Sequence, residues 1–193
     1  MTTKLNILTS EHELIAQCRK RDRNAQRHLF GSYSQTMLAL CCRYVGDQSL
    51  AEEIMLDGFM TVFDKLDQYS HTGSFEGWIR KIMVNKCLTW IRKNKRMYLD
   101  RDIDDLKDSA VVEAVANQLE AEELMAMIRE LPQGYRIVFN MYAIEGYSHK
   151  EIADLLQISE NTSKSQLSRA RRHLQSRLAN YYTPTIKQDK NGS

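Results

Sequence analysis

The sequence predicts an all-α protein: two helical domains joined by an acidic linker, the C-terminal one a helix-turn-helix. Three observations support this fold class. Glycine (8) and proline (2) are scarce among 193 residues, and strand-like alternation is absent. Apolar residues recur instead at the spacing of amphipathic helices. The length suits one or two domains with a real core.

In the N-terminal part, at residues 10–96, we expect four helices separated by short polar turns. Ser10 with Glu13, and Ser49 with Glu52, have the three-residue spacing of a capping box, which marks a helix start. The expected helices cover residues 10–21, 25–46, 49–66 and 75–95, and the polar loop 67–74 precedes the last of them.

The middle of the chain is acidic although the net charge is only +2. Residues 96–130 carry 4 Lys/Arg and 10 Asp/Glu, whereas residues 1–95 carry 14 and 10 and residues 131–193 carry 9 and 5. We interpret residues 97–116 as a linker, which is either a solvated tether or a segment that discourages premature DNA binding.

The C-terminal domain is expected at residues 117–180, followed by a flexible tail at 181–193. Its first helix ends before Pro132, and the next closes at Gly146, a natural residue after a helix end. Ser148 and Glu151 form another capping box at the start of a short amphipathic helix. Ser159 or Asn161 then caps a longer helix, whose buried stripe we expect to be Leu167, Ala170, Leu174 and Leu178.

The two C-terminal helices have the layout of a helix-turn-helix with its recognition helix second. With Leu167 inward and about 100° per residue, five polar side chains point outward and two flank them. The outward ones are Thr162, Ser165, Gln166, Arg169 and Arg172, and the flanking ones are Lys164 and Arg171. Arginine can bind guanine, glutamine can bind adenine, and lysine and serine can hold phosphates. The alternative is a helical hairpin with a solvated charged face.

Composition argues against several other classes of protein. The four cysteines show no C-x-x-C spacing and the five histidines form no Cys/His cluster. We therefore expect reduced cysteines, no metal and no cofactor, with a thiol sensor as the alternative. No apolar run approaches the roughly 18 residues of a membrane span and no signal peptide is present, so we expect a cytoplasmic protein that is not itself a membrane protein.

Two blocks of the chain resemble a known family. Residues 131–174, and above all the runs Glu145–Ala153 and Thr162–Arg171, strongly resemble the C-terminal domain of extracytoplasmic-function sigma factors of bacterial RNA polymerase. Residues 25–96 resemble the N-terminal domain of that family, especially Gly73–Ile79 followed by Ile82 and Asn85. The blocks occur in the order of the family, with an acidic segment between them.

The resemblance implies a sigma factor that is not an enzyme and has no small-molecule substrate. It binds core RNA polymerase and promoter DNA, reads the −10 element as melted single strand and the −35 element as duplex, and usually has an anti-sigma partner, often membrane-anchored. The −35 residues are Thr162, Lys164, Ser165, Gln166, Arg169 and Arg172. The −10 residues are Tyr69, Ser70, His71, Thr72, Gly73, Asn85, Lys86, Arg92 and Lys93. The polymerase contacts are Glu52, Glu53 and Asp57.

The sequence departs from the family pattern at three positions, and other functions stay open. Leu56 stands where the family often has glutamine, Thr89 where it often has an acid or amide, and Gln157 where glycine is common. The second hypothesis is a dimeric helix-turn-helix regulator of palindromic DNA, without polymerase. The third is an enzyme acting on DNA, which needs clustered carboxylates or a zinc site that the sequence does not offer.

Overall fold

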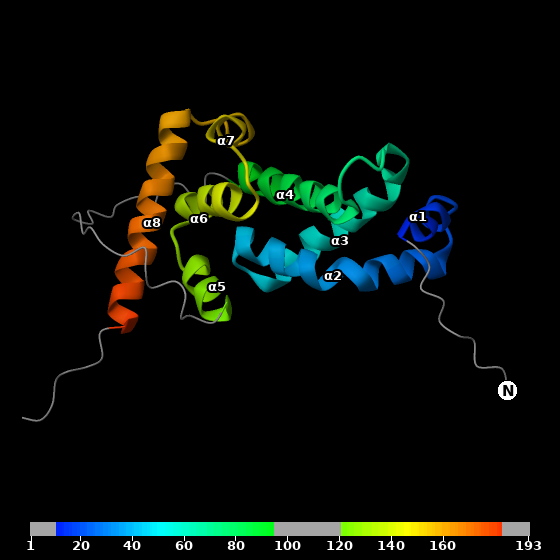
Figure 1. The fold of residues 1–193 in the computed structure, drawn as a ribbon, viewed down its shortest axis with the longest axis horizontal. Coiled ribbons are helices and arrows are strands. Elements are labelled where there is room, and N and C mark those ends of the chain that lie inside the picture. Colours follow the sequence, from blue (N-terminus) through cyan, green and yellow to red (C-terminus); the bar gives the residue numbers. More distant parts are fainter. Residues whose placement is uncertain (1–10, 95–120, 183–193) are drawn as a thin grey trace, which may run out of the picture. The chain divides into compact units, whose positions relative to one another are not determined.

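The structure is a computed structural model that describes residues 11–94 and 121–182. These residues form helices and turns with no strand among them, which confirms the all-α prediction. The chain divides into two compact units, Met1–Ile91 and Arg92–Ser193, and each is described by itself (Figure 1). The predictions for Ser10, for the linker 97–116 and for the tail after residue 182 lie outside the described residues.

Among its described residues, the first unit contains three α-helices and all but the last two residues of a fourth. They are α1 (Glu11–Arg19), α2 (Arg23–Val45), α3 (Gln48–Asp64) and α4 (Phe75–Lys93), with a 3-10 turn, η1 (Leu66–Gln68), after α3. The predicted capping box of Ser49 and Glu52 is wrong. Asp47 caps α3 instead, its carboxylate accepting the N–H of Leu50 at 2.8 Å, so the helix begins before Ser49.

The core of the first unit lies between α2, α3 and α4. The largest side chains that are almost fully buried there are Leu29, Met37, Leu40, Tyr44, Phe59, Phe75, Ile79, Met83 and Leu88. Gly58 of α3 leaves room for the side chain of Met83 on α4, because a Cβ at this position would lie 2.3 Å from the sulfur of Met83.

The second unit is built on its last helix, α8 (Glu160–Tyr182). Before it come α5 (Ala121–Arg129), α6 (Gln133–Phe139), the π-helical turn η3 (Asn140–Ile144) and α7 (His149–Leu156). Ile128, Leu131 and Tyr135 pack against Ala170 and Leu174 of α8 to form the core. Figure 1 shows α7 beside the N-terminal end of α8.

The π-helical turn affects which side chains of this segment face solvent. Met141 is fully buried, whereas the neighbouring Tyr142 is 37% exposed. A π turn holds more residues than an α turn, so it shifts the phase of the side chains within it. Gly146 closes this helix as predicted, with φ at 77° in the left-handed region.

Candidate nucleic-acid interface

The start of α7 is fixed by the capping box that the sequence predicts. Ser148 donates from its backbone N–H and from its hydroxyl to Oε2 of Glu151, at 2.8 and 2.7 Å. The N–H of Glu151 donates to Oγ of Ser148 at 3.2 Å. These bonds satisfy backbone donors that the first turn of a helix leaves free, so they set where α7 begins.

The turn between α7 and α8 is tight and strained at one residue. Gln157 has φ 56° and ψ 48°, the left-handed conformation that glycine adopts more easily. Of the two caps considered for α8, Ser159 is the one used: its Oγ accepts the N–H of Thr162 at 2.9 Å. The turn therefore aims α8 through contacts between near neighbours in the sequence.

The orientation of α8 about its axis follows from its buried stripe. Leu167, Ala170, Leu174 and Leu178 are all buried, as predicted. Because side chains turn by about 100° per residue, Ser165 and Arg169 face away from the core, and both are exposed. This surface can enter a major groove.

Three predicted −35 residues are less exposed than expected, and one of them, Arg172, is half-buried in the lining of a groove along α8. Gln166 was expected to point outward, but it is half-buried on the flank that faces α6, and a Cβ at Gly134 would lie 3.3 Å from its amide nitrogen. Thr162 is half-buried, with its hydroxyl 2.8 Å from that of Ser159. The helical period of α8 predicts correctly which side chains face the core. It does not predict which polar side chains are covered by α6.

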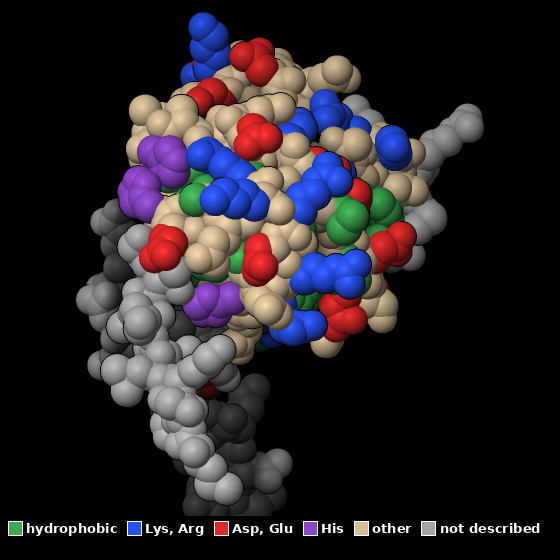
Figure 2. All heavy atoms as spheres, turned by 90° about the vertical axis from the view of Figure 1, so that its right-hand side faces the viewer, with side chains coloured by type: hydrophobic (Ala, Val, Ile, Leu, Met, Phe, Trp, Pro, Cys, Tyr) green, Lys and Arg blue, Asp and Glu red, His purple; other side chains and the backbone are tan. Residues whose placement is uncertain are grey.

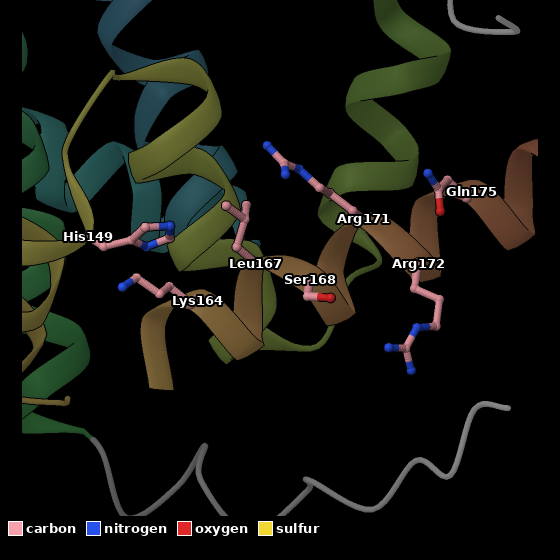
Figure 3. Close-up of a pocket in the computed structure, with 7 residues that line it drawn as sticks. All are labelled: His149, Lys164, Leu167, Ser168, Arg171, Arg172 and Gln175. Carbon is pink, nitrogen blue, oxygen red and sulfur yellow. The ribbon is translucent and has the colours of Figure 1, made fainter. Parts of the chain in front are cut away.

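A groove of about 350 Å³ runs along the other flank of α8 (Figure 3). Its lining is cationic and polar around one apolar residue, and consists of His149, Lys164, Leu167, Ser168, Arg171, Arg172 and Gln175. Lys164 also lies 3.8 Å from Glu160. Such a row of cations and hydroxyl groups favours an anionic phosphate backbone.

His149 connects α7 to α8, a role that the sequence analysis did not find. Its Nδ1 lies 2.9 Å from Oγ of the fully buried Ser163, and its ring stacks on Tyr142 with centroids 4.5 Å apart. The guanidinium of Arg171 lies 5.9 Å from the centroid of the same Tyr142 ring. The only sequence signal was the polar Ser163 inside an apolar stripe.

The predicted −10 residues of the 69–73 loop separate into buried and exposed ones. Tyr69 was expected to contact DNA, but it is 5% exposed and its hydroxyl donates to the carbonyl of Gly73 at 2.8 Å. Its ring packs against those of Phe75 and Trp78, at 5.0 and 5.6 Å. Tyr69 therefore supports the loop from below, which is a correction to its expected role.

The exposed loop residues are Ser70, His71, Thr72 and Gly73. The hydroxyl groups of Ser70 and Thr72 lie 2.9 Å apart. His71 and Gly73 both have a left-handed backbone, with φ at 59° and 90°. The loop thus presents polar groups above an aromatic base.

The remaining predicted −10 residues lie on α4. Asn85, Arg92 and Lys93 are exposed. Asn85 comes ten residues after the start of α4, about 15 Å farther along the helix axis. Lys86 forms an ion pair with Asp57 of α3 at 2.7 Å, which joins residues that the sequence analysis assigned to different partners.

The outward face of α3 combines acids with apolar side chains. Glu52, Glu53 and Asp57 are exposed as expected. Leu56 and Met60, which were not predicted as site residues, are 53% and 63% exposed. They stand four residues apart, opposite the buried stripe of α3, so together they form an apolar surface that suits a protein partner.

Two of the four cysteines, Cys18 and Cys87, are held in an unreactive state. Burial, with a smaller contribution from Asp22, raises the pKa of Cys18 to about 11. A hydrogen bond with Cys41, followed by burial, raises the pKa of Cys87 well above its ordinary value. Few thiolates form at these two positions near neutral pH, which argues against a thiol sensor at Cys18 or Cys87. Among the described residues, no group of His, Cys, Asp and Glu is suited to hold a metal ion, and no helix is long and apolar enough to cross a membrane.

Comparisons with known proteins match both units. A family model described as "Sigma-70 region 2" matches residues 29–97, and one described as "Sigma-70, region 4" matches residues 121–174. The chain is 30% identical over 131 residues to the ECF RNA polymerase sigma factor SigM of Bacillus subtilis, covering 66% of this chain and 79% of that protein. It is 27% identical over 176 residues to SigW of the same organism, covering 85% and 94%.

A solved structure is also similar. It is the sigma factor RpoE from Bartonella quintana in complex with the anti-sigma factor NepR, at 21% identity and a TM-score of 0.49. The match covers 80% of this chain and 96% of that one.

Proposed function

Since this chain belongs to the extracytoplasmic-function group of the sigma-70 family, we propose that its two units divide promoter recognition between them. The chain is a sigma factor: it binds core RNA polymerase and directs transcription initiation at specific promoters. The proposal concerns which residues do each part of this work. The observation that carries it is the exposed cationic side of α8 in a capped helix-turn-helix.

The second unit reads the −35 element as duplex. Ser165 and Arg169 lie on the exposed surface that faces the bases, while Lys164 and Arg172 hold phosphates from the groove. Thr162 and Gln166 lie at the edges of that surface, so their share of base reading is smaller than that of Arg169.

The first unit captures the −10 element as single strand. The exposed loop residues Ser70–Gly73 contact the displaced strand, while Tyr69 holds the loop in shape. Asn85, Arg92 and Lys93 on α4 extend the path of the strand away from the loop, and the Lys86–Asp57 ion pair marks its border with α3. Single-strand binding requires polar edges near stacking surfaces and cations for the backbone, and this arrangement offers both.

The outward face of α3 docks on core polymerase. Glu52, Glu53 and Asp57 supply charge, and Leu56 with Met60 supplies the apolar area that a stable interface buries. The chain itself has no catalytic role, because the polymerase makes the new bonds. It works in the cytoplasm, where the polymerase acts, and an anti-sigma protein, often membrane-anchored in this family, holds it inactive.

Run-off transcription with core polymerase on a fragment library of the host genome tests the function. Discrete start sites that depend on the protein, with two aligned upstream elements, are expected. If core binding and new starts are both absent while duplex binding persists, the dimeric regulator is the correct reading. A dyad-symmetric binding site would support that alternative further.

Two variants test the division of labour. Arg169→Ala should weaken binding to −35 duplex about tenfold, since one base-contacting arginine contributes roughly 1–3 kcal/mol. Thr72→Ala should leave that binding unchanged and reduce open-complex formation. Equal effects of both variants on duplex affinity would contradict the proposed division.

A further inference from the structure

Helix α1 has no part in the functions assigned above, yet it contacts the 69–73 loop. Arg19, in its last turn, donates from Nε and Nη2 to the carbonyl of Leu66 at 3.2 and 3.1 Å. Its Nη2 also donates to the carbonyl of Tyr69 at 2.9 Å, and its Nε lies 3.7 Å from Oδ1 of Asp67. One side chain thus contacts three of the four residues from Leu66 to Tyr69, at the start of the loop.

The guanidinium group is suited to this task by its shape. Its donors lie in one rigid plane, so Arg19 can hold the carbonyls of Leu66 and Tyr69 at a fixed separation. A lysine ammonium is a point charge without that fork, so it can replace only part of the contact.

A second contact from α1 reaches the exposed part of the loop. The rings of His12 and His71 stack with centroids 4.6 Å apart and planes 16° apart. His71 has φ 59°, a conformation that is costly for a residue with a Cβ, and its ring also lies 4.7 Å from that of Tyr69. Contacts on two sides therefore stabilise an otherwise unfavourable backbone.

Helix α1 is itself firmly attached to the unit. Leu14, Ile15 and Cys18 are buried. The hydroxyl of Tyr33 on α2 donates to Oε2 of Glu11 at 3.1 Å. Because α1 is fixed to the core in this way, its contacts with the loop also fix the position of the loop relative to the core.

We propose that α1 is a brace that preorganises the 69–73 loop for single-strand capture, with Arg19 as its main positioning residue and His12 as the second. This inference rests on the proposed −10 function of the loop. The face of the molecule in Figure 2 mixes Lys and Arg with Asp and Glu, so charge alone does not supply a strong attraction for the strand. Capture then depends on the shape of the loop, and holding that shape in advance lowers the ordering cost of binding.

The test compares Arg19→Gln and Arg19→Lys with Lys20→Gln in the full chain. Lys20 is exposed and adjacent, so Lys20→Gln removes the same charge without touching the loop contacts. The first readout is amide hydrogen exchange in residues 66–73. The second is the affinity of the holoenzyme for a single-stranded −10 oligonucleotide that carries 2-aminopurine, taken from a promoter found by run-off transcription.

With Arg19→Gln, exchange in the loop should rise and single-strand affinity should fall about tenfold, whereas Lys20→Gln should change neither. Arg19→Lys should recover part of the loss. Binding to −35 duplex and to core polymerase should be equal in all three variants. Unchanged exchange and affinity in Arg19→Gln would overturn the proposal.

His12→Ala and His71→Ala provide a second test that does not depend on Arg19, in case Arg19→Gln unfolds the unit. Both histidines are exposed, so neither change removes core packing. The losses of single-strand affinity should be less than additive in the double variant, because both changes break one contact. Fully additive losses would refute the contact with His12.

The Thr72→Ala variant distinguishes failure of the loop function from failure of the brace. If Thr72→Ala leaves the single-strand affinity unchanged, the proposed function of the loop is wrong. If Thr72→Ala lowers the affinity but the Arg19 and His12 variants do not, only the proposed brace is wrong.

Discussion

The two DNA-facing regions are held in place over very different distances along the chain. Bonds between near neighbours set the start of α7 and of α8, such as Ser148 with Glu151 and Ser159 with Thr162, each three residues apart. The 69–73 loop depends on Arg19, which is separated from Leu66 by 47 residues and from Tyr69 by 50. Packing changes elsewhere in the first unit should therefore alter the conformation of the loop. Packing changes elsewhere in the second unit should have little effect on the α7–α8 turn.

The largest expected effect is the loss of a core side chain in the second unit, which should destabilise that unit and leave the stability of the first unit unchanged. Leu174→Ala removes a buried residue of the α5–α6–α8 core and should cost about 3 kcal/mol of unfolding free energy. Both tryptophans, Trp78 and Trp90, lie in the first unit, so tryptophan fluorescence reports that unit alone while circular dichroism reports both. In urea, only the dichroism transition should shift. An equal shift in fluorescence would mean that the units unfold together.

The second largest expected effect is a loss of stability of the first unit at alkaline pH. The pKa of Cys18 is raised from 9.0 to about 11, and burial, together with the contact to Glu11, raises that of Tyr33 from 10.0 to about 12. A raised acid pKa means that the fold favours the neutral form. This stability is fully present below pH 9 and is lost as pH rises towards 11, by roughly 2 kcal/mol for Cys18.

Urea unfolding followed by tryptophan fluorescence at pH 8 to 11 measures this loss. Cys18→Ala is the control variant, since it removes the contribution of Cys18 to the slope between pH 9 and 11 and leaves that of Cys87, whose pKa is also raised. A slope unchanged by that substitution would show that Cys18 does not carry the effect.

A smaller change tests the support of the loop. Tyr69→Phe keeps the ring that packs against Phe75 and Trp78 but removes the hydroxyl that donates to the carbonyl of Gly73. The loss of one such bond should cost about 1 kcal/mol, concentrated in local opening of the loop. Faster amide exchange at residues 70–73 with unchanged −35 binding is the expected result. Exchange that rises evenly across the first unit would contradict a local role.

The smallest expected effect is a gain in the stability of the second unit. Gln157→Gly relieves a left-handed backbone in the α7–α8 turn and should stabilise this unit by about 0.5 kcal/mol, since part of the relief is offset by the greater freedom of glycine in the unfolded chain. Thermal unfolding followed by circular dichroism measures the gain. The fluorescence transition of the first unit serves as the internal reference and should not move.

The sequence by itself determined the features that depend on near neighbours. The all-α class, the capping box at Ser148, the left-handed closure at Gly146 and the buried stripe of α8 were all predictable, because helix period and capping act over three to seven residues. The same reasoning failed at α3, where Asp47 and Ser49 both offer a cap and the nearby sequence does not rank them.

Only the tertiary structure decided which polar side chains are free to meet DNA. Tyr69 is buried beneath its loop, Gln166 lies against α6, and Lys86 is paired with Asp57. The contacts of Arg19 and His12 with the loop likewise join positions that are 50 and 59 residues apart. No local pattern contains this information, because it depends on how the helices pack, and packing is set by side chains that are far apart in the sequence.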